Sequence, residues 1–119
     1  MQLLTKRVYE AAAPEDGLRI LIDRLWPRGV TKEAARIDYW AKDIAPSAEL
    51  RKWFGHDPTK WDEFRKRYHA ELDANPKALA QLRERFGPGP VTLVFGSKEE
   101  KYNNATSLRE YIQSRHAEK

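Results

Sequence analysis

The sequence predicts a single α/β domain in which helices pack on a small, mostly parallel sheet of about three strands. Two short, mainly apolar segments, residues 18–25 and 91–95, are typical of strands that are buried on both faces. In the first, only Arg19, Asp23 and Arg24 are polar. Between them, the chain carries apolar residues at the three- and four-residue spacing of helices. Strand, helices, strand and helix in this order favour an α/β fold, and 119 residues suit one domain over residues 1–119.

The first part of the chain contains two predicted strands. Residues 4–9 form a short strand candidate, and Pro14 and the pair Asp16 and Gly17 indicate a turn after it. Residues 18–25 read LRILIDRL, and we predict that they form the central strand. The connection of about eight residues is short for a parallel crossover, so the direction in which these two strands would pair stays open.

Three predicted helices follow, each after a proline. Pro46 precedes the first, and Asp57 and Asn75 each stand directly before a proline, as expected of an N-cap and the first helical position. Residues 91–95 then form a strand parallel to residues 18–25, because the long interval between them allows a crossover. A fourth predicted helix follows this strand. The apolar stripes of the last three of the four helices are Trp61, Phe64, Tyr68 and Leu72; Leu79, Leu82 and Phe86; and Ala105, Leu108 and Ile112.

Composition excludes several classes of site. The chain has no cysteine, which rules out disulfides, thiolate nucleophiles and cysteine-ligated metals, and we predict no cofactor. No apolar run approaches the roughly 18 residues of a membrane span, and Lys6 and Arg7 interrupt the short apolar start, unlike a secretory signal. We therefore expect a cytoplasmic protein with no membrane partner, and a monomer as the default state.

Polar residues follow the two buried strands. In an open parallel sheet, ligands bind beyond the carboxyl ends of the strands, so residues 23–29 and 96–104 are expected to share one rim. The last helix begins there, and its free amide groups and dipole favour an anion. Arginine supplies a planar, two-pronged donor to a phosphate or carboxylate, which predicts a small anionic metabolite as the ligand. The candidate ligand-binding residues are Asp23, Arg24, Trp26, Arg28, Ser97, Lys98, Asn103 and Asn104.

The same residues also have a purely structural interpretation. Asp23 can pair with a neighbouring arginine, and Asn103 or Asn104 can cap the last helix. Trp26 can stack on a ligand ring or fill the core. Arg28 is the strongest single candidate for ligand contact, because the proline before it and the glycine after it display it on a loop with little freedom.

His56 is a candidate for acid/base chemistry, since histidine is the side chain most easily tuned to proton transfer near neutral pH. No second histidine stands at a metal-ligand spacing, and Asp57 is explained as a helix cap, so we predict no metal site. No G-x-S-x-G motif supports a serine nucleophile. The catalytic residues therefore stay unknown, and the sequence leaves open whether the protein is an enzyme.

The alternative function is a non-catalytic interaction module that associates weakly with nucleic acid through a basic helix face. Arg65, Lys66 and Arg67, with Lys52 and Lys60, could follow a phosphate backbone. Carboxylates alternate with these cations, and 22 basic against 18 acidic residues give a net charge of only +4. We therefore favour a solvated helix face and do not expect sequence-specific binding of nucleic acid.

Residues 23–29 read DRLWPRG, seven residues of unusual content. The other matching segments are Lys6-Arg7-Val8-Tyr9, Asp16-Gly17, Pro46-Ser47, Leu50-Arg51 and Asn103-Asn104-Ala105. Together these motifs make the chain resemble the short, YeaO-like members of the family called domain of unknown function 488, over almost its whole length. This resemblance implies no established reaction.

The chain departs from the longer relatives at two motifs. Those relatives carry a Thr-Ile-Gly-His-Ser start and a Cys-His-Arg triplet after the last strand. Here, Thr5-Lys6-Arg7-Val8-Tyr9 and Asn103-Asn104-Ala105 stand at those places. Chemistry that rests on the cysteine is therefore not carried over.

Overall fold

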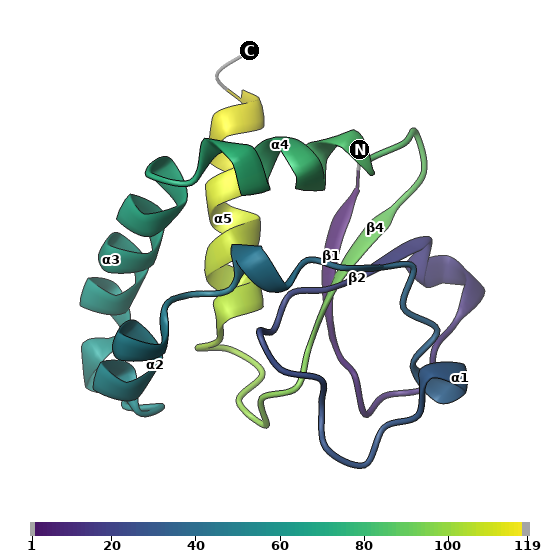
Figure 1. The fold of residues 1–119 in the computed structure, drawn as a ribbon, viewed down its shortest axis with the longest axis horizontal. Helices are drawn as coiled ribbons and strands as arrows, with labels where there is room; N and C mark the ends of the chain where they lie inside the picture. Colours follow the sequence, from purple (N-terminus) through teal and green to yellow (C-terminus); the bar gives the residue numbers. More distant parts are fainter. Residues whose placement is uncertain (1, 118–119) are drawn as a thin grey trace.

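The computed structural model describes residues 2–117, which form a four-stranded sheet in the order β1-β4-β2-β3 with every neighbouring pair parallel (Figure 1). The predicted α/β class and the parallel pairing of β2 with β4 are confirmed. A two-residue strand adds to the three that the sequence indicates, because so short a segment shows no alternation. The strands are β1 (Leu3–Arg7), β2 (Leu18–Leu21), β3 (Tyr39–Trp40) and β4 (Val91–Phe95).

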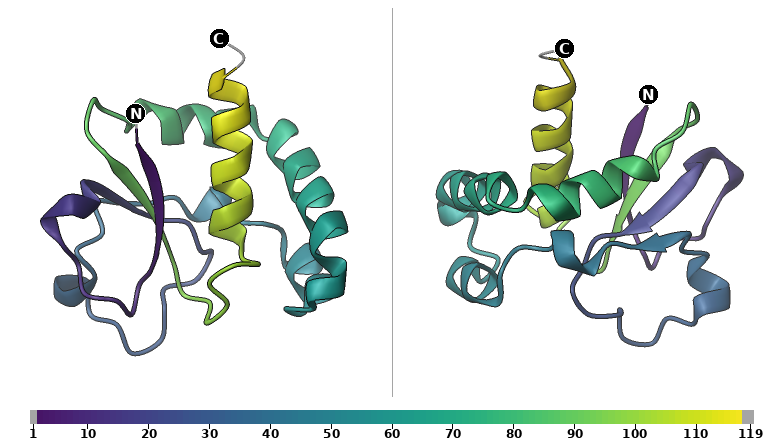
Figure 2. Two further views of the ribbon diagram at one scale, coloured as in Figure 1. Left: turned by 180° about the vertical axis from the view of Figure 1, so that it is seen from behind. Right: turned by 45° about the horizontal axis from the view of Figure 1, so that its top comes forward.

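The helices cover both faces of the sheet unequally. Helices α2 to α5 lie on one face, and the short α1 lies on the other with the loop that follows β2 (Figures 1 and 2). No helix in the described part of the chain is long and apolar enough to cross a bilayer. The helices are α1 (Lys32–Ala35), α2 (Ala48–Phe54), α3 (Trp61–Asp73), α4 (Pro76–Glu84) and α5 (Asn104–Ala117), with single 3-10 turns at Pro14–Asp16, Lys42–Ile44 and Pro58–Lys60.

Two of the three predicted N-terminal positions are capped by side chains. The Ser47 hydroxyl accepts a hydrogen bond from the backbone of Leu50 at the start of α2. Asp57 accepts one from Thr59, but it caps the 3-10 turn Pro58–Lys60, and α3 itself begins at Trp61. Asn75 stands at the expected position, but its side chain donates to the Asp43 carbonyl instead of capping α4. The local sequence therefore indicates where a helical segment begins. Whether the residue before it caps that segment with its side chain depends on the other groups within reach of that side chain.

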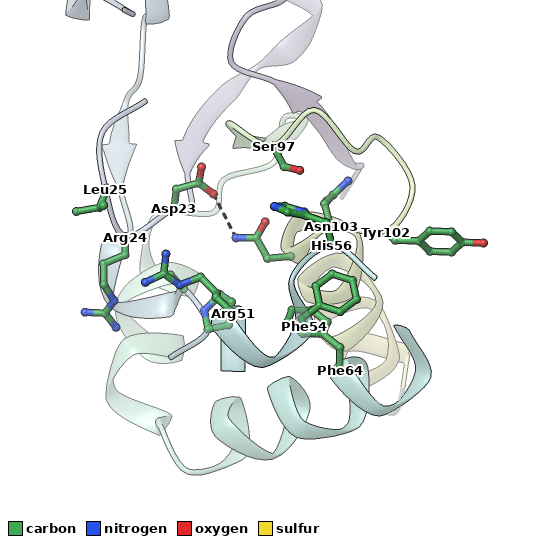
Figure 3. A pocket seen from close by; sticks show the side chains of 13 residues that line it. Asp23, Arg24, Leu25, Arg51, Phe54, His56, Phe64, Ser97, Tyr102 and Asn103 are labelled. Atoms are coloured by element: carbon green, nitrogen blue, oxygen red, sulfur yellow. Dashed lines mark hydrogen bonds between the residues drawn. The ribbon is translucent and has the colours of Figure 1, made fainter. Parts of the chain in front are cut away.

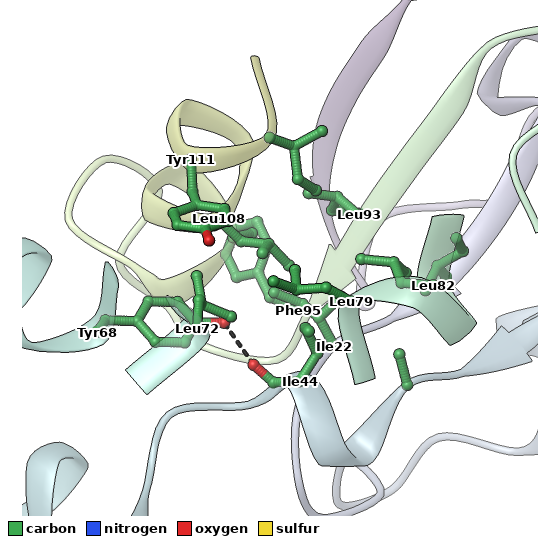
Figure 4. Close-up of a cluster of buried hydrophobic side chains, with 14 of the residues drawn as sticks. Ile22, Ile44, Tyr68, Leu72, Leu79, Leu82, Leu93, Phe95, Leu108 and Tyr111 are labelled. Carbon is green, nitrogen blue, oxygen red and sulfur yellow. Dashed lines mark hydrogen bonds between the residues drawn. The ribbon is translucent and has the colours of Figure 1, made fainter. Parts of the chain in front are cut away.

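Alternation along β2 and β4 divides the core in two. Ile20, Leu93 and Phe95 face the large cluster beneath α2 to α5, where the Tyr68 hydroxyl donates to the Ile44 carbonyl at 2.7 Å (Figure 4). The opposite face carries a smaller cluster beneath α1. Its buried members are Val8, Leu21, Ala35 and Val94, with Trp26, Val30, Ile37 and Trp40 packed against them.

Strand β1 pairs with β4 and not with β2, so the expected neighbour was wrong. The direction of pairing, which the sequence left open, is parallel. Residues 8–17 carry the chain back across β4 to the start of β2. That path is about 20 Å, from five residues of strand and two strand spacings, while ten extended residues reach about 33 Å. The short connection is therefore sufficient, with one 3-10 turn at Pro14–Asp16.

The second strand ends at Leu21, before the predicted end at residue 25. The Ile22 amide still donates to the Val94 carbonyl, but β4 ends at Phe95 and offers no further partner. The chain therefore turns away, and Leu25 is 72% exposed instead of buried. This early end of β2 creates the space in which the candidate site lies.

Candidate functional site

A pocket of about 290 Å³ opens at the carboxyl ends of β2 and β4, between the loop after β2, the end of α2 and the start of α5 (Figure 3). This is the edge of the sheet where the sequence predicts a ligand. Its polar lining residues are Asp23, Arg24, Arg51, His56, Ser97, Tyr102, Asn103 and Asn104, and its apolar ones are Leu25, Ala45, Pro46, Phe54 and Phe64.

Asp23 joins the three segments that form the pocket. One carboxylate oxygen accepts the Gly96 amide at 2.8 Å, and the other accepts the Asn104 side-chain amide at 3.2 Å. Burial raises the pKa of Asp23 above the usual value of an aspartate, because it outweighs the opposite effect of these two hydrogen bonds and of the charge of Arg51. The carboxyl thus holds the end of β4 and the first residue of α5 against the loop after β2.

Two arginines bring positive charge to the pocket. Arg24 comes from the loop after β2, and Arg51 comes from α2. Neither forms a salt bridge with a carboxylate in the described part of the chain. In Figure 3 the Arg51 side chain extends toward Asp23 and Arg24, away from the aromatic wall. Even when Asp23 is ionised, the two guanidinium groups leave the pocket with an excess of positive charge.

The position of Arg51 is fixed by the packing of α2. The Ser47 hydroxyl that caps this helix also donates to the Glu71 carboxylate of α3 at 2.6 Å, and Glu71 accepts the Ser47 amide at 2.8 Å. Leu50 and Phe54 on the inner side of α2 are buried in the large cluster. The helix is therefore held by both its cap and its apolar face, and Arg51 is presented from a rigid element.

His56 lines the pocket from a strained backbone position. Its φ of 59° lies in the left-handed region, which costs a residue other than glycine about 1–2 kcal/mol. The left-handed turn begins at Gly55, where α2 ends. Such strain clusters at functional sites, and the centroid of the His56 ring lies 6.3 Å from that of the Phe54 ring, which also lines the pocket.

Aromatic side chains form the apolar wall of the pocket. The rings of Phe54 and Phe64 are stacked with centroids 4.4 Å apart, and both residues are buried. The Tyr102 ring packs against Trp61 at 5.3 Å, and its hydroxyl points outward in Figure 3. A ligand in this pocket therefore meets charge on one side and aromatic carbon on the other.

The loop after β4 uses its polar side chains to hold its own shape. The Ser97 hydroxyl accepts the Glu99 amide, and Asn103 donates to the Glu99 carbonyl. Asn103 also accepts the Thr106 amide at 2.9 Å, so it caps α5. This contact occupies one of the helix amides that the sequence assigns to the anion, and it leaves the arginines as the main source of positive charge.

Three of the predicted rim residues lie outside the pocket, which corrects their placement. The Trp26 indole donates to the Val30 carbonyl at 2.6 Å and packs edge-on against Trp40 beneath α1. Arg28 is exposed, and its carbonyl, not its side chain, is used by the Tyr9 hydroxyl. Lys98 is exposed on the loop after β4. The chain reverses after residue 25, so residues 26–28 follow the opposite face of the sheet.

Several pocket residues are missed by sequence reasoning. Arg51 and the phenylalanines lie in helices far along the chain from β2 and β4. Helical periodicity explains Phe54 and Phe64 as core residues and gives no reason to place them beside a ligand. The one available signal is the Leu50-Arg51 pair, which is part of the family motif.

Two arginines on the basic face of α3 form ion pairs with carboxylates of the same chain. Arg65 bonds to Asp62 and Glu110, and Arg67 bonds to Glu63. The Arg67 guanidinium also lies 4.1 Å from the Trp53 ring centroid.

Residues 2–115 hold no group of three or more histidine, cysteine or acidic side chains that could bind a metal ion.

Comparisons with known proteins agree with the sequence motifs. A family model described as DUF488-N3i, the inactive DUF488-N3 subclade, matches residues 2–119. An uncharacterized protein of Mycobacterium tuberculosis (strain ATCC 25618 / H37Rv) is 43% identical over 109 residues, 92% of each chain. The uncharacterized protein YeaO of Escherichia coli (strain K12) is 40% identical over 114 residues, 96% of this chain and 99% of that one. No solved structure gives a significant match. The chain therefore belongs to the DUF488 family, in the inactive DUF488-N3 subclade and with YeaO among its relatives.

Proposed function

We propose that the protein binds a small ligand that carries a carboxylate or phosphate, in the pocket at the ends of β2 and β4. The observation that carries this proposal is the pair of arginines, Arg24 and Arg51, which line a concave pocket without a carboxylate partner in the described chain. Guanidinium groups are well suited to bind such anions in a two-pronged geometry. We expect this binding in the cytoplasm, with which a chain free of cysteine is compatible.

Binding without turnover suits this site better than catalysis. The matching family model is described as inactive. By the family resemblance of the sequence, Asn103-Asn104-Ala105 stands where longer relatives carry Cys-His-Arg. Asn103 uses its side chain to cap α5. His56 keeps its place as the candidate acid/base residue, but the hydroxyl–histidine hydrogen bond of the described chain joins Ser107 to His69 and not to His56.

Replacing Arg51 with alanine is expected to remove most of the ligand-dependent stabilisation. With phosphate or a small carboxylate at about ten times its Kd, the melting temperature of the wild type should rise by about 6 °C. Loss of one charge-assisted contact weakens binding roughly tenfold or more, so the rise in Arg51→Ala should fall below about 2 °C. Thermal melts with and without each anion measure both values.

Arg28→Ala is the matched control, because Arg28 is an exposed arginine on the same loop as Arg24 but lies outside the pocket. It should change the free energy of unfolding by less than about 1 kcal/mol and keep the full response to ligand. An equal loss of response in Arg28→Ala and Arg51→Ala would argue against this pocket. A wild type that responds to no anion would contradict the proposed function.

Duplex DNA is expected to bind weakly and without sequence preference. Arg65 and Arg67 are paired with carboxylates, so few phosphates can be neutralised and the dependence of affinity on salt should be shallow. Fluorescence anisotropy titrations of two unrelated duplexes at several salt concentrations test this. Tight, sequence-selective binding at physiological salt would instead favour the interaction-module alternative.

A further inference from the structure

A carboxylate and two guanidinium groups line the same pocket and form no salt bridge with one another. Each Asp23 oxygen accepts one N–H, from Gly96 or from Asn104. An ionised carboxylate offers about four acceptor positions, so about two stay available. Asp23 forms no salt bridge with Arg24 or Arg51, although all three side chains line the cavity. The cavity therefore separates a carboxylate with spare acceptor capacity from two guanidinium groups.

A simple anion satisfies only half of this arrangement. It gains from Arg24 and Arg51 but lies near a carboxylate of the same sign, and that repulsion reduces its affinity. A ligand that also carries an ammonium group turns the repulsion into a charge-assisted hydrogen bond. The polar side of the pocket is thus complementary to two opposite charges on one small molecule.

We propose that the ligand is a zwitterion of the amino-acid class, whose ammonium group binds Asp23 and whose carboxylate binds Arg51 and Arg24. This inference rests on the proposed function, because it keeps the arginines as the anion site. The ammonium donates to the Asp23 oxygens beside the hydrogen bonds from Gly96 and Asn104.

The size and the wall of the pocket narrow the class further. About 290 Å³ lies at the lower end of the volumes that hold small molecules, which suits a compound of amino-acid size. Phe54, Phe64 and Ala45 form the wall that meets the ligand side chain, and all three are buried and apolar. An apolar side chain gains free energy by leaving water there, whereas a charged one would lose its solvation. We therefore expect an amino acid with an apolar side chain.

The test compares leucine with two analogues that each lack one charge. Isocaproate keeps the carboxylate and the side chain but has no amine, and isoamylamine keeps the amine but has no carboxylate. Isothermal titration of the wild-type protein up to millimolar concentrations gives the three affinities. We expect leucine to bind about tenfold or more tighter than isocaproate, since each analogue loses one charge-assisted contact.

The outcomes separate this inference from the proposed function. Equal binding of leucine and isocaproate would overturn the zwitterion and leave the anion site standing. If isoamylamine matched leucine, the arginines would have no role and both proposals would fail. If neither leucine, isocaproate nor inorganic phosphate bound, both would fail as well.

Asp23→Asn provides a second test on the protein side. Asparagine has the same shape as aspartate, and the side-chain oxygen of the introduced asparagine can still accept the Gly96 amide. If the side-chain amide of Asn104 flips, its oxygen can accept the new amide of residue 23. We expect this variant to lose the preference for leucine over isocaproate and to bind isocaproate at least as tightly as the wild type. A preference that survived would overturn the role of Asp23. Should the variant fail to fold, the analogue series on the wild type decides the question.

Discussion

Arg19→Met is expected to lower the free energy of unfolding by about 3 kcal/mol, at the lower end of the range for broken buried ion pairs. Arg19 is only 3% exposed beneath α1. Its guanidinium donates to the Asp16 carboxylate at 2.6 Å, and two of its other N–H groups donate to the Ala35 carbonyl at 2.8 and 3.0 Å. Methionine fills a similar volume but supplies none of these donors, so a buried carbonyl loses both of its partners.

The remaining contacts of Asp16 set the size of this effect. Lys6 donates to the carboxylate at 3.1 Å, and the Ala13 amide does so at 3.0 Å. Burial raises the pKa of Asp16, but the hydrogen bonds from Ala13, Lys6 and Arg19 outweigh it and the net pKa is lowered. Lys6 and the Ala13 amide remain as partners of Asp16 in the variant, so the loss does not reach the upper end of the range.

Urea unfolding of wild type and variant, followed by circular dichroism, measures this loss as a shift in the midpoint. Arg67→Met is the matched control, because Arg67 forms an exposed pair with Glu63 one helical turn away. That substitution should change stability by no more than about 1 kcal/mol. Equal effects of the two substitutions would show that the buried network contributes little.

Gly17→Ala is expected to destabilise the protein by about 3 kcal/mol or more. The φ of Gly17 is 64° with a ψ of −133°, a combination that side chains rarely adopt. An added Cβ would also overlap the Pro90 carbonyl oxygen. That oxygen accepts the Leu18 amide at 3.0 Å, the contact that sets β2 beside the start of β4. Relief of the clash would therefore pull apart the central strands.

Gly29→Ala separates backbone strain from steric overlap. Gly29 has a φ of 77°, but a Cβ there would meet no atom within 4 Å. This variant should lose only about 1–2 kcal/mol. Thermal or urea unfolding of both variants gives the comparison, and a Gly17→Ala protein as stable as Gly29→Ala would contradict the close contact with Pro90.

Local patterns were sufficient for the elements and for their class. Apolar runs at residues 18–25 and 91–95 identify the strands because a near-continuous run is typical of a strand buried on both faces, although β2 ends at Leu21. Stripes such as Leu79 and Leu82 identify the helices by their three- and four-residue spacing. Sequence motifs also identified the family. The parallel order of the two buried strands placed Asp23 and Asn104 on one edge of the sheet, where both line the pocket. Each of these features depends on neighbours within one element or one connection.

Tertiary structure alone decided which segments meet. Three features depend on partners far along the chain. They are the pairing of β1 with β4, the early end of β2, and the reversal that takes Trp26 and Arg28 away from the pocket. Arg51 joins the site only because α2 packs by its cap on α3 and by its apolar face on the core. Periodicity tells which face of an element is buried, but it carries no information about which other element covers that face. The sequence by itself therefore determined the fold class and one edge of the site, and packing supplied the second arginine and the aromatic wall.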